Sequence, residues 1–168
     1  MKTVKLVAAA AAVLIIAAVA VSAAFSPLCL VLEDADSGEI YAALPVKEGE
    51  KFSVTFTHSV NKTDETELYE VRGGEIYLTG CVYYSFGAGV AEVLDENWSL
   101  EIGDGGEMII SEINMKMAPL RYVVGTVSDH VLSIGGRQIS LRGLCGRSSS
   151  VIFTVRRRLL FKGSDESV

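Results

Sequence analysis

The feature that most constrains the fold is an apolar repeat of period two that runs through most of the chain after Pro27. Segments of about four to ten residues, rich in β-branched and aromatic side chains, are bounded by glycine and aspartate, whereas helical spacing is almost absent. We expect strands at residues 28–33, 39–44, 52–58, 65–72, 75–84, 108–115, 120–127, 130–134, 138–141 and 151–156. So many short strands predict one all-β domain, an antiparallel β-sandwich or a barrel-like fold.

Paired glycines mark two of the turns. Gly73 and Gly74 stand in "VRGGEI", and Gly135 and Gly136 stand in "SIGGRQI". A two-residue hairpin turn requires positive φ, which glycine adopts without strain. We therefore expect two tight β-hairpins at these positions.

The N-terminal segment has a different character. Lys2 and Lys5 precede an apolar run from Leu6 to Phe25, which is typical of an export signal. The run has about the length that spans a bilayer, and its positive flank suits an uncleaved anchor, but small residues near its end also offer cleavage sites. Residues 1–25 are thus a signal peptide or a membrane anchor helix. Residues 26–160 form the extracytoplasmic β-domain, in the periplasm or on the outer face of the cytoplasmic membrane, and 161–168 a disordered tail.

Three cysteines, Cys29, Cys81 and Cys145, lie in the exported part of the chain. In an oxidising compartment they allow at most one internal disulfide, and the sequence does not choose the pair. Cys81 and Cys145 fall inside expected strand or turn segments. We therefore expect them to be buried or bridged and not catalytic.

Charge is unevenly distributed along the chain. Residues 33–112 contain 18 acidic and 4 basic residues, and residues 113–168 contain 3 acidic and 9 basic ones. The two parts can pair within one fold; alternatively, the basic segment "VRRRLLFK" at 155–162 lies against anionic lipid or an acidic partner. An exported acidic chain disfavours nucleic acid as a partner.

The stretch "FTHSVNKTDETELYEV" carries the first candidate site. Alternation places His58 at the end of an apolar stripe, and it places Glu65, Glu67, Tyr69 and Val71 on one face of the next strand. A register that pairs His58 with Glu67 would point both inward and raise the pKa of the imidazole. The alternative is a structural cross-strand pair that closes the end of the core.

Between these two strands, Asn61, Lys62 and Thr63 could hold a carboxylate or a phosphate. Equally, Asn61, Thr63 and Asp64 could cap the turn. A second stretch, "YYSFGAGV", places Gly87 and Gly89 around Ala88. Its backbone N–H groups could receive an anion or a peptide edge, or the glycines could ease a bend.

Together the two stretches resemble the DUF1850 family of uncharacterised exported bacterial proteins. The matching residues are His58-Ser59-Val60, Lys62-Thr63, Glu67, Tyr69 and Ser85-Phe86-Gly87-Ala88-Gly89. The later "VVGTVSDHVLSIGGRQISL" is similar to the C-terminal part of that family, so the resemblance covers most of residues 51–158. Members are commonly encoded beside TAXI-type TRAP solute transporters, which implies a transport-linked accessory role. No reaction is established for the family.

Our first hypothesis is therefore an extracytoplasmic, non-catalytic binding module without a cofactor. The candidate patch comprises His58, Ser59, Lys62, Thr63, Glu67, Tyr69, Ser85, Phe86, Gly87 and Gly89. Its partners would be the membrane or solute-binding subunits of a TRAP transporter, and the membrane itself if the anchor stays uncleaved.

Two other classes of function remain as alternatives. Cys81 with His58 could serve a cysteine-dependent exported enzyme of transpeptidase type, although "YLTGC" matches a sortase cysteine motif only superficially. His58, Asp64 and Glu67 could hold one cation, but one histidine with carboxylates makes a poor zinc set, and no calcium-loop spacing is present. We expect His130 to open a hairpin strand and not to act as a ligand.

Overall fold

The computed structural model describes residues 12–17, 26–58, 62–84 and 95–158. Residues 12–17 are helical. Among the residues described, no helix has the length and apolar character that crossing a membrane needs. The predicted tail at 161–168 and most of the predicted signal or anchor lie outside the described residues.

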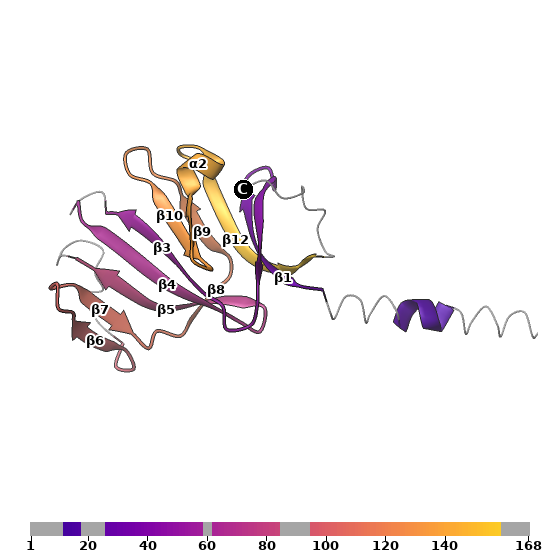
Figure 1. The fold of residues 1–168 in the computed structure, drawn as a ribbon, viewed down its shortest axis with the longest axis horizontal. Coiled ribbons are helices and arrows are strands. Elements are labelled where there is room, and N and C mark those ends of the chain that lie inside the picture. Colours follow the sequence, from indigo (N-terminus) through magenta and orange to yellow (C-terminus); the bar gives the residue numbers. More distant parts are fainter. Residues whose placement is uncertain (1–11, 18–25, 59–61, 85–94, 159–168) are drawn as a thin grey trace, which may run out of the picture.

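The β-domain consists of two antiparallel sheets (Figure 1). The strands are β1 (Leu28–Asp34), β2 (Ile40–Val46), β3 (Lys51–Thr57), β4 (Asp64–Arg72), β5 (Glu75–Tyr83), β6 (Ser99–Ile102), β7 (Met108–Ser111), β8 (Met115–Met117), β9 (Leu120–Val123), β10 (His130–Ile134), β11 (Arg137–Ser140) and β12 (Ser150–Arg157), and a short helix, α2, spans Leu141–Cys145. The small sheet has the order β2-β1-β12-β9, and the large sheet has the order β11-β10-β3-β4-β5-β7-β6, with β8 also paired to β5. The predicted all-β fold is confirmed as an open sandwich.

The two glycine-pair turns form as predicted. Gly73 and Gly74 have φ of 60° and 72°, and Gly135 and Gly136 have φ of 55° and 76°. They join β4 to β5 and β10 to β11, whose strands pair directly. The turn chemistry of the sequence therefore fixes two hairpins of the large sheet.

Other boundaries differ from the sequence prediction. The strand expected at 108–115 divides into β7 and β8, because Glu112 between them adopts a φ of 61°. The strand expected at 120–127 ends at Val123. The prediction missed β6 and α2 altogether. The helix is a single turn, capped by Ser140, whose side chain accepts a hydrogen bond from the Gly143 N–H at 2.8 Å.

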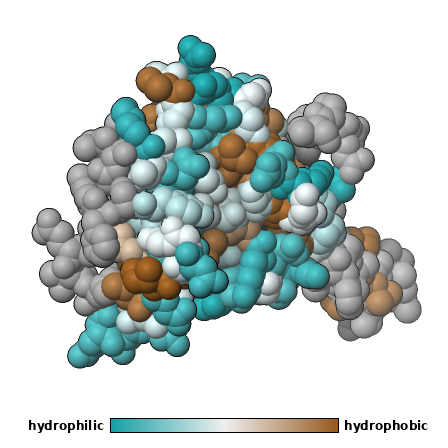
Figure 2. Space-filling model, turned by 60° about the vertical axis from the view of Figure 1, so that its left-hand side comes forward, coloured by the Kyte–Doolittle hydropathy of each residue, from teal (hydrophilic) through white to brown (hydrophobic). Residues whose placement is uncertain are grey.

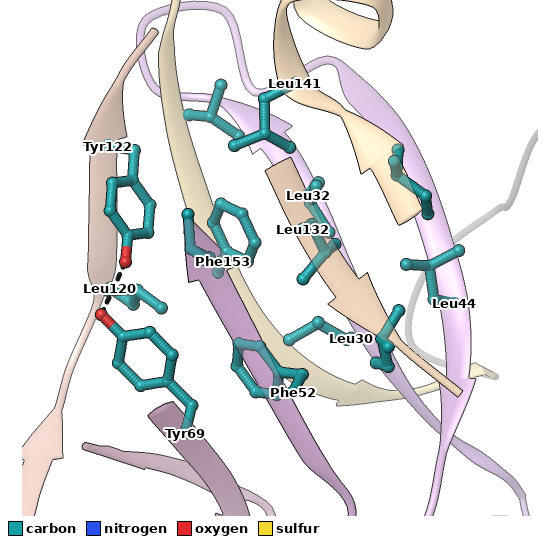
Figure 3. Packing of buried hydrophobic residues seen from close by; sticks show 14 of the residues in the cluster. Leu30, Leu32, Leu44, Phe52, Tyr69, Leu120, Tyr122, Leu132, Leu141 and Phe153 are labelled. Carbon is teal, nitrogen blue, oxygen red and sulfur yellow. Dashed lines mark hydrogen bonds between the residues drawn. The ribbon is translucent and has the colours of Figure 1, made fainter. Parts of the chain in front are cut away.

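The main core lies between the two sheets (Figure 3). Leu30 and Leu32 of β1 and Phe153 of β12 are fully buried in the small sheet. They face Leu132 and Phe52 of the large sheet, where Phe52 also stacks on Tyr69 at 5.1 Å. The alternation of apolar side chains in the sequence therefore corresponds to the inner faces of the sandwich.

All three cysteines are free thiols. Cys29 and Cys81 are buried, whereas Cys145 is half-buried. The expectation of burial is confirmed for Cys81, and the alternative of a disulfide is not realised.

Gly80 gives a test of packing within the large sheet. It lies on β5 opposite Leu68, and a Cβ there would lie 2.7 Å from the carbonyl oxygen of Ile110 on the neighbouring strand β7. We expect Gly80→Ala to push β7 away and to lower the free energy of unfolding by about 2 kcal/mol, as overpacking commonly does. Urea unfolding followed by circular dichroism measures this. An unchanged urea midpoint would show that β7 can move away without a loss of stability.

Candidate functional site

The β3–β4 hairpin has a different register from the one predicted. Thr57 pairs with Asp64, and Val54 pairs with Glu67. His58 therefore lies four residues beyond the partner of Glu67, roughly 13 Å along the strand. The predicted His58–Glu67 pair is wrong, and a cation site that joins these two residues with Asp64 is not formed.

His58 instead belongs to the turn. Its N–H donates to the carbonyl oxygen of Thr63 at 2.8 Å, and its own carbonyl accepts from the N–H of Lys62 at 3.0 Å. Lys62 is exposed, with a φ of 56°, and Thr63 is half-buried. The turn thus presents a cationic side chain at the end of the hairpin. Ser59 lies outside the described residues.

The second stretch begins beside this turn. Because Tyr83 of β5 pairs with Glu65 of β4, Tyr84 lies at the same end of the large sheet as Asp64. The segment before β10 reaches this end too, where Ser128 Oγ donates to the carbonyl oxygen of Thr57 at 3.1 Å. We call this region, defined by His58, Lys62, Thr63 and Tyr84, the turn end. Ser85, Phe86, Gly87 and Gly89 lie outside the described residues.

Glu67 and Tyr69 lie deeper, between the sheets. As predicted, they share the inner face of β4 with Glu65 and Val71. Tyr69 Oη donates to Glu67 Oε2 at 2.9 Å, and Tyr122 Oη on β9 donates to the same carboxylate oxygen. The two hydroxyls also lie 2.7 Å apart (Figure 3). We call Glu65, Glu67, Tyr69 and Tyr122 the carboxylate–tyrosine cluster.

This cluster links the two sheets through polar groups. Burial raises the pKa of both Tyr69 and Tyr122 far above the ordinary value, and the neighbouring Glu67 adds to the effect. Both phenols therefore remain protonated and act as donors. Glu67 accepts hydrogen bonds from tyrosines of both sheets, so this residue is a structural element of the sandwich as well as a part of the predicted patch.

Glu65 is buried, with 9 % of its surface exposed. Burial, and then the charge of Glu67, raises its pKa to about 7, against an opposing hydrogen bond with Tyr83. Two carboxyl groups close together in a poorly solvated site do not both ionise readily. The cluster therefore gains or loses a proton near neutral pH.

Cys81 stands opposite Glu67 on β5. Burial raises the pKa of its thiol to about 12, so the sulfur is protonated at neutral pH and lacks the thiolate that nucleophilic chemistry requires. In the large sheet Cys81 lies level with Val54, four residues from His58. The register does not bring this histidine beside the thiol.

His130 opens β10, as predicted. It pairs with Phe56, and its ring stacks on the Phe56 ring at 5.0 Å and lies 5.5 Å from the ring of Tyr122. Its Nδ1 accepts a hydrogen bond from the N–H of Gly125 at 3.4 Å. Burial lowers its pKa. The imidazole thus extends the aromatic packing beside the carboxylate–tyrosine cluster.

Sequence reasoning missed two residues of this region. Tyr122 occupies a buried position in the alternating pattern of β9. This pattern indicates that the side chain is buried, but it does not indicate that the side chain contacts the opposite sheet. Tyr83 ends β5, and only the β4–β5 register places it beside Glu65. Both contacts depend on how strands from distant parts of the chain are arranged.

The surface offers no single apolar patch that would define the site on the face drawn in Figure 2, where brown hydrophobic residues form separate groups among hydrophilic ones. Exposed large hydrophobic side chains among the described residues include Leu100, Ile102 and Val127. Scattered apolar residues of this kind are ordinary on protein surfaces. The candidate site is therefore better defined by the turn end.

Comparison with known proteins identifies the family. No curated protein and no solved structure matches the chain. A model of the DUF1850 family, described as a domain of unknown function, matches residues 52–141, which run from the start of β3 to the start of α2 and include the described residues of the turn end. Because this match covers more than half of the 168 residues, the chain belongs to the DUF1850 family.

Proposed function

We propose that this protein is an extracytoplasmic, non-catalytic accessory module that binds a subunit of a TRAP-type solute transporter through the turn end. The observation that carries the proposal is the register of β3, β4 and β5. It places the first family stretch, around His58 and Lys62, beside Tyr84, where the second stretch begins. The described residues of the second stretch, Tyr83 and Tyr84, thus lie at the same end of the large sheet as the first stretch.

The contacts at the N-terminal edge of the β-domain support tethering of this domain to a membrane. Arg157 Nη1 donates to the carbonyl oxygen of Ser26 at 3.0 Å, and the N–H of Arg158 donates to that of Pro27 at 3.0 Å. Basic side chains therefore lie where the chain leaves residues 1–25, a position that suits anionic headgroups if this segment is an uncleaved anchor. Figure 1 shows the end of β3 and the start of β4, where the turn end lies, on the opposite side of the domain from the start of β1.

The alternative, a cysteine-dependent exported enzyme that uses Cys81 and His58, has less support. The thiol is buried and protonated, and the strand register separates it from the histidine. Catalysis by this pair would require a large rearrangement of the sheet.

The test is purification of the full-length tagged chain from native membranes, followed by mass spectrometry. We expect transporter subunits to accompany the native protein and to be reduced at least about tenfold, equivalent to 1.4 kcal/mol, with a His58→Ala, Lys62→Ala variant. Lys47→Ala is the matched control, because Lys47 is an exposed lysine before the start of β3, at the other end of the sheet. Equal recovery with the double variant, or no enrichment of subunits with the native chain, would contradict the proposal.

A further inference from the structure

The strand β6 forms one edge of the large sheet (Figure 1). It pairs with β7 along one side, where Ser99 stands opposite Ser111 and Ile102 stands opposite Met108. Along its other side, the backbone N–H and C=O groups have no strand partner in the described part of the chain. An unpaired edge of this kind is able to add a strand from another polypeptide through main-chain hydrogen bonds.

Two apolar side chains lie on one face of this edge. The register places Leu100 beside Ile110 and Ile102 beside Met108, on the inner face of the large sheet. Ile110 and Met108 are buried, whereas Leu100 is 43 % exposed and Ile102 is 61 % exposed. The apolar inner face therefore extends by one strand beyond its buried part. A further strand beside β6 would bring its own side chains next to these two residues, at the usual strand spacing of about 4.8 Å.

The other face of β6 and its neighbouring segments are acidic. Glu101 is exposed on the outer face, beside Ile109 of β7. Residues 95–115 contain six acidic residues and no lysine, arginine or histidine. None of the six takes part in an ion pair between described residues. This edge therefore carries negative charge that no cation of the described chain pairs with, and it favours a positively charged partner.

A second copy of the chain fits this edge poorly. If two copies paired in antiparallel fashion through β6 with their apolar faces on the same side, Leu100 would stand opposite Ile102. Glu101 would then stand directly opposite the same residue of the other copy. Like charges in that position destabilise a strand pair, and the other acidic residues of 95–115 would add to the repulsion. The charge of the edge therefore selects a foreign strand with basic side chains.

We propose that β6 binds an extended peptide segment in which apolar and basic residues alternate, and that this segment adds to the large sheet as a further antiparallel strand. Apolar side chains of the peptide lie beside Leu100 and Ile102, and a basic side chain lies opposite Glu101. The alternation is required because successive side chains of a strand point to opposite faces. β6 is not part of the turn end, so this binding is independent of the proposed function. The His58→Ala, Lys62→Ala variant is expected to bind the peptide as the native protein does.

Isothermal titration calorimetry on the full-length protein tests the proposal, with the peptide acetyl-KVKVK-amide as the probe. Its two valines match the spacing of Leu100 and Ile102, and its central lysine then stands opposite Glu101. We expect a Kd in the millimolar range or below. The peptide acetyl-KKVVK-amide has the same composition without the alternation, and acetyl-EVEVE-amide has the alternation with the opposite charge. Neither of these two peptides should bind measurably.

Substitutions at exposed positions separate strand addition from general charge attraction. Glu101→Lys should weaken binding of acetyl-KVKVK-amide at least about tenfold and should allow acetyl-EVEVE-amide to bind. Glu39→Lys makes the same change at an exposed residue next to β2, and it should leave the affinity for both peptides unchanged. Ile102→Ser should weaken binding of acetyl-KVKVK-amide about fivefold through the loss of an apolar cross-strand contact. Circular dichroism should show an unchanged fold for all three variants.

Hydrogen exchange measured by mass spectrometry locates the contact. The bound peptide should slow exchange of the backbone amides at residues 99–102 and leave those of β2, an edge strand of the small sheet, unchanged. Unchanged exchange at 99–102, equal binding of the alternating and non-alternating lysine peptides, equal effects of Glu101→Lys and Glu39→Lys, or no binding of acetyl-KVKVK-amide at millimolar concentration would each overturn the proposal. A dimer in sedimentation that Ile102→Ser dissociates would also overturn it, because a second copy would then occupy the edge.

Discussion

Replacing Tyr122 by alanine is expected to lower the free energy of unfolding by about 3–5 kcal/mol, the usual cost of deleting a buried aromatic ring. Tyr122 is 8 % exposed, and its ring lies 5.6 Å from the ring of Phe153 in the small sheet and 6.3 Å from that of Phe56 in the large one. Alanine would leave a cavity between the sheets and would remove a hydroxyl that donates to Glu67. Urea unfolding measures the loss.

Two further variants separate the contributions to this loss. Tyr122→Phe keeps the ring and should cost about 1 kcal/mol, because Tyr69 still donates to Glu67 at 2.9 Å. Val123→Ala changes the next residue, which is 63 % exposed, and should alter stability by less than about 0.5 kcal/mol. If Tyr122→Ala cost no more than Tyr122→Phe, the ring would not join the sheets as described.

The second large effect is a loss of stability as pH rises from about 4.5 to 7. Glu65 has a pKa of about 7 in the folded state and an ordinary value of 4.5. Between these values the folded state holds a proton that the unfolded state has released, so the unfolded state binds fewer protons and stability must fall as pH increases. The difference corresponds to a contribution on the order of 3 kcal/mol, fully present below pH 4.5 and lost as pH passes through 7.

The measurement is urea unfolding at a series of pH values for the native protein and for Glu65→Gln. The variant cannot ionise at this position, so its stability should decline much less over the same range. Glu101→Gln, at an exposed position in β6 of the same sheet, serves as the control and should retain the native pH dependence. A native profile that declines no more steeply between pH 5 and 7 than the profile of Glu65→Gln would exclude the assigned role of Glu65.

Local chemistry made much of the fold predictable. Positive φ at Gly135 and Gly136 allows a tight turn, and the side chains on either side alternate between buried and accessible positions, so the hairpin could be recognised from the sequence. Glu112 illustrates the opposite case, since its positive φ divides an apolar stretch that otherwise reads as one strand. Such a conformation at a non-glycine residue depends on the surrounding structure and has no clear local signal.

The candidate site was predictable to a smaller extent. Period two placed Glu65, Glu67 and Tyr69 on one face correctly, because this follows from strand geometry alone. The partner of Glu67 did not follow, since it depends on the register of the β3–β4 hairpin, which pairs Glu67 with Val54. The contact of Tyr122 with Tyr69 could not be predicted at all, because it joins two different sheets.

The strand order of the small sheet also bears on the sequence of folding events. β1 lies between β2 and β12, so the first strand of the domain pairs with the last one described. Leu30 and Leu32 therefore cannot be fully covered until residues 150–157 have been synthesised and have returned to β1. Pairing over such a long loop is slow compared with hairpin formation. The apolar first strand of the domain therefore remains uncovered for as long as the last described strand is absent.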